Sequence, residues 1–408
     1  MIKPKDYFSK FKYEACIFIT LCMNFLLFFT KEEIMSDALY PIHLVDIKAG
    51  FISRTLVGTI NGLLFSKPTI VQTAVVHTAI TIITFLLTAI FIGGCIRAAE
   101  KESGKQLFLL SLVFAVAPYG FMTFINLFEL LDIYWVLAAA LCLLAADGKK
   151  AAFLIPLFIV IGGWAHYSFV LAFMPVIYVV FFNKLIKEKG KRTYILTALM
   201  VTVSVASTIY FFSTSRTFNV ISFDEFTQYI LDKAGDKITE FEVYCGEAFR
   251  PYDEIPYDYY IEKYNLPEWT RDASDLKRAL YGYFAFAFID GSFAGLISDV
   301  LLALPAVAFF GIIWHKAMKT AETKADRFMY FLCMISPLIQ VVALFTSSDT
   351  SRWLSLMMIS DLFMLAYFIK EKSAPVTASL GFCFDIMKKH KAALLFLALF
   401  YLSIVFVW

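Results

Sequence analysis

Eight ionisable residues stand between the long apolar stretches of this 408-residue chain. Their types are suited to binding an anionic substrate and to proton transfer. They are Asp37, Asp46, Arg54, Glu129, Asp132, His166, Asp349 and Arg352. An arginine guanidinium can bind a phosphate group through its planar fork of donors. A carboxylate or a histidine can take a proton from an acceptor hydroxyl. If the fold brings these residues together, we expect a site for a phosphorylated, sugar-bearing lipid.

The residue types also predict separate roles within such a site. Arg54 and Arg352 are the expected phosphate ligands, and Asp349 is expected to orient Arg352 from three positions earlier in the chain. The expected catalytic residues, from which a proton acceptor would come, are Asp46, Asp37, Glu129, Asp132 and His166.

Each of these residues has a structural alternative. Asp349 can cap the helix that follows it, and Arg352 can extend to lipid headgroups. Arg54 can act as an anchor in an apolar stretch, Asp132 as one of an ordinary pair of turn acids, and His166 as a hydrogen-bonded core histidine. The sequence alone leaves both interpretations open.

The composition of the chain predicts a membrane protein. Hydrophobic residues make up 60% of the chain and charged residues 17%, whereas a soluble domain carries about a quarter charged residues. The apolar blocks, each about 17 to 25 residues long, can cross a hydrocarbon core as helices. The shorter segments of alternating polarity that are typical of membrane strands are absent. We expect an all-α fold, a polytopic transmembrane helical bundle that forms a single membrane domain over residues 1–408.

Lysine and arginine in short loops mark the cytoplasmic side and give the expected topology. The basic start of the chain places the N-terminus in the cytoplasm, and later basic loops, including 370–391, give about eleven spans with the C-terminus outside. A long exoplasmic loop insertion is expected over 213–280, with a helix over 222–234. In this topology all eight candidate residues face the outside.

One pair of spans is expected to be unusually short. Residues 153–182 lie between two basic loops, so the chain must enter and leave the membrane within about 30 residues. We expect two short helices that meet at 162–167, a segment that contains two glycines and His166. A second turn is expected at 126–132, between two spans over 107–146.

Several classes of chemistry lack their sequence motifs. The chain contains no GxxxxGK[ST] phosphate loop, no GxGxxG in a suitable context and no HExxH. Its seven cysteines show neither zinc-ligand spacing nor a disulfide framework. We expect no cofactor, with a divalent metal left open, and no nucleic-acid partner.

Short motifs give the chain a resemblance to a known group of proteins. They are Asp46-x3-Gly50-Phe-Ile-Ser-Arg54-x3-Gly58, Asp132-Ile-Tyr-Trp135, His166 followed by Tyr167, and Asp349-x2-Arg352-Trp353. With these motifs the whole chain resembles bacterial polytopic proteins of surface-polysaccharide loci. The plan is similar to Wzy-type O-antigen and capsular polysaccharide polymerases and to C-type glycosyltransferases, which use polyprenyl-phosphate sugars.

The resemblance implies roles for four residues. It implies a catalytic base at Asp37 or Asp46, in the first outside loop. It also implies that Arg54 and Arg352 bind the lipid pyrophosphate. The chain departs from the polymerases in its long loop, where no clear Arg-x-Gly motif stands, and this departure leaves the handling of the acceptor open.

Three functions are therefore in view. The leading hypothesis is a glycosyltransferase or polysaccharide polymerase that uses a polyprenyl-(pyro)phosphate-linked sugar or oligosaccharide at the outer face of the bacterial cytoplasmic membrane. Its expected partners are membrane lipid and other proteins of a polysaccharide assembly pathway. The alternative is a transporter or flippase for a lipid-linked glycan, which would use polar groups within spans, such as His77 and Asp361. The third is a subunit that anchors partners through its long loop.

Overall fold

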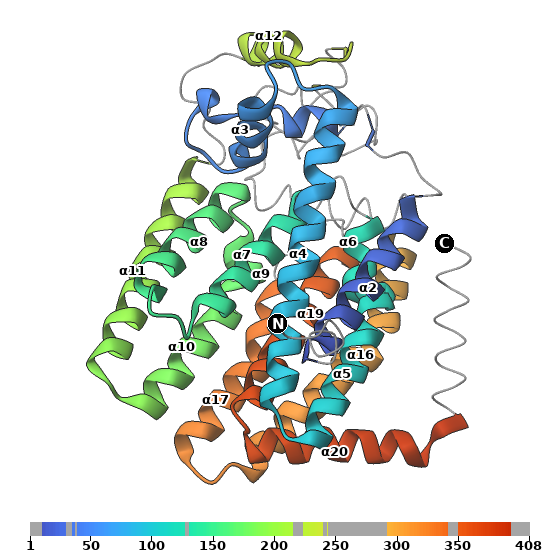
Figure 1. Cartoon of the computed structure of the whole chain (residues 1–408), viewed down its shortest axis with the longest axis vertical. Helices are drawn as coiled ribbons and strands as arrows, with labels where there is room; N and C mark the ends of the chain where they lie inside the picture. Colours follow the sequence, from blue (N-terminus) through green and yellow to red (C-terminus); the bar gives the residue numbers. More distant parts are fainter. Residues whose placement is uncertain are drawn as a thin grey trace, which may run out of the picture.

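The computed structural model describes residues 10–29, 35–36, 39–126, 130–214, 223–239, 243, 292–341 and 350–392. Every regular element within these ranges is a helix, which confirms the all-α prediction. The longer helices stand side by side as a bundle, and three helices, α3, α12 and α20, lie at its two ends (Figure 1).

The helices of the bundle come from both halves of the described chain. Their bounds are α2 Lys12–Phe29, α4 Ile70–Ala98, α5 Lys101–Val116, α6 Thr123–Asn126, α7 Asp132–Ala145, α8 Ala151–Ala165, α9 Phe169–Ala172, α10 Met174–Glu188, α11 Lys191–Thr214, α16 Ser292–Thr320, α17 Lys324–Ile335 and α19 Thr350–Lys370. The end helices are α3 Thr55–Leu64, α12 Phe223–Lys233 and α20 Ala374–Lys389.

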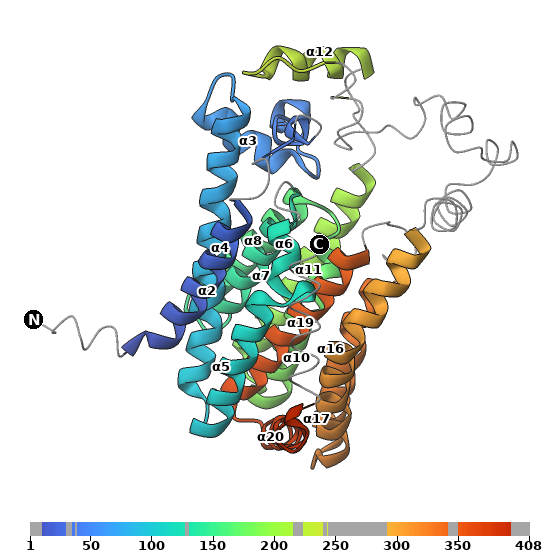
Figure 2. The same ribbon diagram turned by 90° about the vertical axis from the view of Figure 1, so that its right-hand side faces the viewer.

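Four helices have the length and composition of membrane-spanning helices. They are α4, α11, α19 and the part of α16 over Ile297–Thr320. These helices differ in how deeply they are buried. In the most apolar 18-residue window, 94% of α19 is buried, but only 22% of α11 and 22% of α16. Thus α19 lies in the interior of the bundle (Figure 2), and α11 and α16 carry exposed apolar side chains such as Ile209 and Leu301.

Prolines and a close glycine contact explain why other apolar segments form shorter helices. Helix α5 ends at Val116, and Pro118 begins an irregular turn before α6. At Gly120 an added Cβ would lie only 2.0 Å from the carbonyl oxygen of Phe114, so the turn needs glycine to fold back on α5. Helix α17 likewise passes into a 3-10 turn that contains Pro337.

The predicted pair of short helices is confirmed. Helix α8 ends at Ala165, and the chain turns through His166 into α9 and then α10. An added Cβ at Gly162 would lie 2.7 Å from the ring of Phe169, so this glycine lets the chain after the turn pack directly on α8. The predicted helix over 222–234 is found as α12, whereas residues 127–129 of the turn predicted at 126–132 lie outside the described residues.

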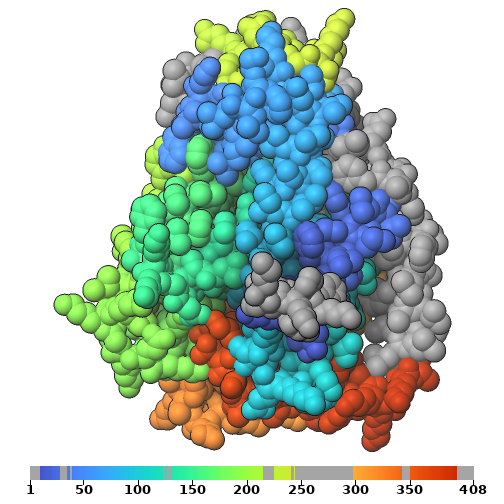
Figure 3. Space-filling view, in the orientation of Figure 1, coloured from blue at the N-terminus to red at the C-terminus, as the bar shows by residue number. Residues whose placement is uncertain are grey.

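The two ends of the bundle are closed differently. Helices α3 and α12 cover one end, which Figure 3 shows as a compact cap above α4. At the other end the segment 370–391, expected as a loop, contains α20, which lies across the bundle (Figure 1). Val376, Leu380 and Cys383 of α20 are buried against the bundle, at the spacing of one helical face.

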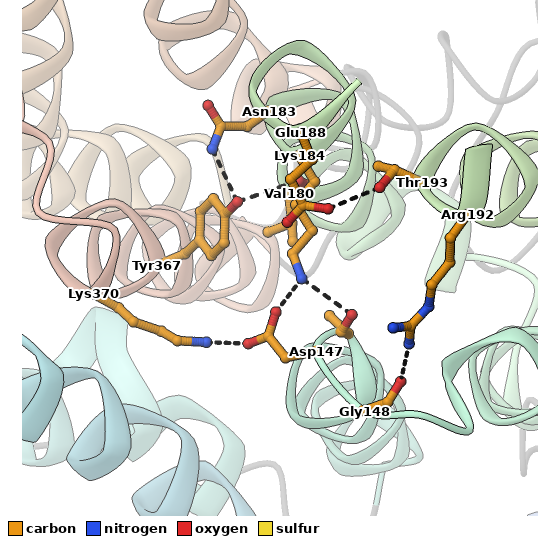
Figure 4. A network of polar contacts seen from close by, with 11 residues as sticks. Asp147, Gly148, Val180, Asn183, Lys184, Glu188, Arg192, Thr193, Tyr367 and Lys370 are labelled. Carbon is orange, nitrogen blue, oxygen red and sulfur yellow. Dashed lines mark hydrogen bonds and ion pairs between the residues drawn. The ribbon is translucent and has the colours of Figure 1, made fainter. Parts of the chain in front are cut away.

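A polar network at the α20 end ties the turn between α7 and α8 to α10, α11 and α19 (Figure 4). The Asp147 carboxylate, in the turn between α7 and α8, forms ion pairs with Lys184 of α10 and Lys370 of α19. Arg192 of α11 donates to the carbonyl oxygen of Gly148 at 2.7 Å. Each charge in this group has a protein partner, so the network fixes helix positions.

Candidate functional site

The segment before α3 is attached to the end of α8 by three hydrogen bonds. The backbone N–H of Arg54 donates to the carbonyl oxygen of Trp164 at 2.8 Å. The Trp164 indole donates to Thr55 Oγ1 at 2.7 Å, and the backbone N–H of Tyr167 donates to Ser53 Oγ at 2.7 Å. These bonds place Arg54 beside the turn that follows α8.

Arg54 adopts a backbone conformation that is unusual for its residue type. Its φ is 75°, in the left-handed region, and it caps the N-terminus of α3. A non-glycine residue there is strained by about 1 kcal/mol or more, and such strain persists where surrounding contacts fix the backbone. The hydrogen bonds of Ser53, Arg54 and Thr55 to the end of α8 and the turn after it provide that constraint, so the backbone of Arg54 is fixed by contacts before and after it.

His166 lies in the turn between α8 and α9 and has a defined tautomer. The backbone N–H of Ser168 donates to His166 Nδ1 at 3.1 Å, so the neutral ring carries its hydrogen on Nε2. The imidazole stacks on Tyr167, with ring centroids 4.5 Å apart, and lies 5.1 Å from the ring of Trp135. His166 therefore offers Nε2–H as a donor to a neighbouring group.

Two arginines from distant segments act on this histidine. Burial lowers the pKa of His166 well below its usual range, and the positive charges of Arg54 and Arg352 lower it further. Both arginines must lie near the ring for this effect, although they are almost 300 positions apart in the sequence. His166 thus stays neutral at physiological pH.

Arg352, near the start of α19, also pairs with the first residue of α7. Its Nε lies 3.2 Å from Asp132 Oδ2, and the two side chains are only 15% and 6% exposed. This ion pair joins α7 to α19 beside His166. We call Arg54, Asp132, His166 and Arg352 the arginine site. The structure thus brings four of the eight predicted residues together.

Two tryptophans complete the arginine site and were not among the predicted site residues. Trp135 follows Asp132 on α7, and Trp353 directly follows Arg352 on α19. Their ring centroids lie 6.1 Å apart, and Arg352 Cζ lies 5.6 Å from the Trp353 ring. The only sequence signal for them was their place inside the short motifs that contain Asp132 and Arg352.

Asp46 lies elsewhere, near the other end of α3. An added Cβ at Gly62 would lie 3.4 Å from Asp46 Oδ2, and Gly62 is eight residues from Arg54, or about 12 Å along a helix. The Asp46 carboxylate accepts hydrogen bonds from Tyr229 and from the Lys48 backbone and forms an ion pair with Lys233. It therefore fastens α12 to the segment before α3, apart from the arginine site.

The remaining predicted residues cannot be placed. Asp37, Glu129 and Asp349 all lie outside the described residues. The role of Asp349 in orienting Arg352 stays a prediction, and among the described residues the carboxylate that contacts Arg352 is Asp132.

The two polar residues within predicted spans each contact a neighbouring aromatic side chain. His77 Nδ1 lies 3.2 Å from the Tyr134 hydroxyl, and Asp361 Oδ1 accepts a hydrogen bond from the Trp314 indole at 2.7 Å. Such bonds between helices are typical of membrane bundles. Within the described residues, no group of three or more His, Cys, Asp or Glu side chains could hold a metal ion.

The electrostatics of Asp46 predict how α12 responds to pH. Burial alone would raise the pKa of Asp46, but hydrogen bonds from Lys233, Tyr229 and Lys48 outweigh burial, and the net pKa lies below the ordinary value of 3.8. A lowered carboxyl pKa stabilises the folded state above the ordinary pKa, and this stabilisation is lost as pH falls through the lowered pKa. We expect α12 to stay attached at neutral pH and to loosen only below about pH 4.

Asp46→Asn tests this attachment. The substitution removes the ion pair with Lys233, so the α12 amides should exchange with solvent roughly tenfold faster at neutral pH. Hydrogen exchange measured by mass spectrometry reports this directly. Asp232→Asn, at an exposed position on α12, is the matched control and should leave exchange unchanged. Equal exchange in the Asp46 and Asp232 variants would contradict the role given to Asp46.

The pKa of His166 gives a test of the arginine site in the absence of any substrate. Arg352→Gln removes a nearby positive charge, so the pKa of His166 should rise. Histidine Cε1–H resonances of the labelled protein report the titration, and His166→Asn identifies the resonance. Arg327→Gln, at an exposed position on α17, should leave the pKa of His166 in place. If the pKa of His166 is the same in both variants, Arg352 does not lie close enough to His166 to affect it.

Comparisons with known proteins provide no family for this chain. No family model matches it, and neither a curated protein nor a solved structure shows significant similarity to it.

Proposed function

We propose that this protein is a membrane glycosyltransferase or polysaccharide polymerase that uses a polyprenyl-(pyro)phosphate-linked sugar at the outer face of the bacterial cytoplasmic membrane. One observation carries the proposal: Arg54 and Arg352, from opposite parts of the chain, stand on segments that meet beside His166. The Arg54 N–H donates to the carbonyl oxygen of Trp164, and Arg352 pairs with Asp132 on the helix whose Trp135 contacts the His166 ring. Two guanidinium groups and an imidazole N–H at one place suit the oxygens of a phosphate that links a sugar to a lipid.

The reaction in this proposal replaces one bond at the sugar. The acceptor hydroxyl oxygen forms a bond to the anomeric carbon, the bond from that carbon to the phosphate oxygen breaks, and the acceptor loses a proton. Arg54 and Arg352 hold the departing phosphate and offset its charge. Of the predicted acid–base groups beside the arginines, we assign the acceptance of this proton to Asp132, because the neutral His166 already carries a hydrogen on Nε2 and its Nδ1 accepts from Ser168.

The proposal includes the predicted topology of about eleven spans, a cytoplasmic N-terminus and an outside C-terminus. Helix directions support it, because short links join α4 to α5, α10 to α11 and α16 to α17 at the α20 end of the bundle (Figure 1). Arg97, Lys101, Lys191 and Lys324 stand at these links, as expected for a cytoplasmic face. The arginine site, after α8 and at the start of α19, then lies toward the opposite, exoplasmic side.

The test is genetic and biochemical. A strain that lacks the protein should lose a surface glycan or show a changed glycan length, and the purified protein in liposomes should elongate or transfer a lipid-linked glycan. An Arg327→Ala protein serves as the matched control for the arginine-site variants, since Arg327 is exposed on α17. A surface glycan of normal length and composition in the deletion strain would overturn the proposal.

A flippase for lipid-linked glycans is the second candidate. The observation in its favour is that His77 and Asp361 are buried within the long helices α4 and α19. A flippase would move labelled lipid-linked glycan across liposomes without forming a glycosidic bond, and His77→Phe would stop this movement. Bond formation by the purified protein would decide for the transferase.

A further inference from the structure

Two indole N–H groups of the arginine site have no hydrogen-bond partner among the described residues. Trp135 Nε1 and Trp353 Nε1 each expose less than 1 Å². Buried polar groups in proteins are almost always paired, and an unpaired buried donor destabilises the fold. Trp164 and Trp314, the other tryptophans in the described part of the chain, each donate to a side-chain oxygen at 2.7 Å.

These two donors sit within one small cluster. The ring of Trp135 lies between those of His166 and Trp353, at centroid distances of 5.1 Å and 6.1 Å. Arg352 covers the Trp353 ring at 5.6 Å and is 15% exposed.

Almost every group at this place is a hydrogen-bond donor. Indole and guanidinium groups donate only, and His166 presents Nε2–H because its Nδ1 already accepts from Ser168. The described carboxylate of the site, Asp132, is paired with Arg352. A ligand that satisfies such a site must bring several acceptor oxygens and no hydrogens of its own, which describes a phosphate or diphosphate.

On the basis of the proposed function, we infer that Trp135 and Trp353 donate their indole N–H groups to phosphate oxygens of the lipid-linked substrate. They are binding residues of the same site as Arg54 and Arg352, and they add neutral donors to its two cations. A diphosphate, with four non-bridging oxygens, uses this donor set more fully than a phosphodiester with two.

The experiment measures binding of farnesyl diphosphate to the full-length protein in nanodiscs. Replacing Trp135 or Trp353 by benzothienylalanine keeps the shape of the ring and removes only the N–H. Each replacement should weaken farnesyl diphosphate binding about tenfold and should leave the thermal stability of the ligand-free protein unchanged or higher. The same replacement at Trp314, whose N–H is already bonded to Asp361, should lower thermal stability and leave the Kd unchanged.

Indole resonances give a second readout. With ¹⁵N-labelled tryptophan, the N–H signals of Trp135 and Trp353 should move downfield when farnesyl diphosphate binds, and the signal of Trp314 should stay in place. Arg352→Lys should weaken binding as well, which ties the ligand to the arginine site.

The outcomes separate this inference from the proposed function. Unchanged Kd values in both benzothienylalanine proteins, with binding that still requires Arg54 and Arg352, would overturn the role of the tryptophans and leave the proposed function standing. No binding of farnesyl diphosphate to the native protein, or binding no tighter than that of inorganic pyrophosphate, would contradict a lipid-linked phosphate ligand and with it both proposals.

Discussion

Arg352→Ala is expected to lower glycan transfer about 30-fold or more, the largest loss that we expect from a single substitution. The change removes a phosphate ligand, and it also leaves the Asp132 carboxylate without the guanidinium 3.2 Å away. Removing one partner of a buried, hydrogen-bonded charge pair at a binding site costs about 2–5 kcal/mol, and 1.4 kcal/mol corresponds to a factor of ten. The measurement is the rate of transfer from a lipid-linked sugar by purified protein in liposomes.

Conservative variants sharpen this test. Arg352→Lys keeps the charge but loses the planar fork of donors, so its activity should fall between those of the native protein and the Ala variant. Arg327→Ala on α17 removes an exposed arginine and should retain native activity. Full activity of Arg352→Ala would show that the arginine site is not the site of glycan transfer.

Asp132→Ala is expected to cause the largest loss of stability. Its side chain is 6% exposed, and without it the guanidinium of Arg352 loses the carboxylate that joins α19 to α7. Breaking a buried ion pair from one side destabilises a protein by about 3–5 kcal/mol, whereas replacing both partners can be nearly neutral. Thermal unfolding in detergent should therefore show a clear drop in Tm for Asp132→Ala.

The double variant is the decisive comparison. Asp132→Asn with Arg352→Gln removes both charges and leaves a polar amide at each position, so its Tm should recover toward the native value while transfer activity stays low. Tm changes that simply add in the double variant would show that the two side chains do not act as a pair.

Sequence patterns predicted the helices better than they predicted which residues meet. Hydrophobic blocks and basic loops gave the all-α class, and the two glycines before His166 indicated the turn after α8. The segment 370–391, which contains α20, was misassigned because its many lysines suggested a loop, although Val376, Leu380 and Cys383 already stand at helical spacing. A periodicity of three to four residues was a better guide there than charge.

The candidate site was predicted only in part, for a physical reason. Asp46 and Arg54 are close in sequence, yet α3 lies between their side chains, so Asp46 fastens α12 and Arg54 faces His166. Contacts across helices, such as that of Asp132 with Arg352, depend on how the helices pack, which no local pattern encodes. Trp135 and Trp353 stand inside the short motifs, but no local pattern marked them as residues of the site.

Photo-crosslinking is the most direct test of the claim that distant segments form one site for a lipid-linked phosphate. A short isoprenoid diphosphate with a photoreactive group next to the phosphates would be bound to the native protein in nanodiscs, irradiated, and the labelled peptides sequenced. We predict labels in three peptides, those around Arg54, around His166 and at the start of α19, and their loss in Arg352→Ala. Labels confined to one of these peptides, or found only on lipid-facing helices such as α11, would contradict a shared site.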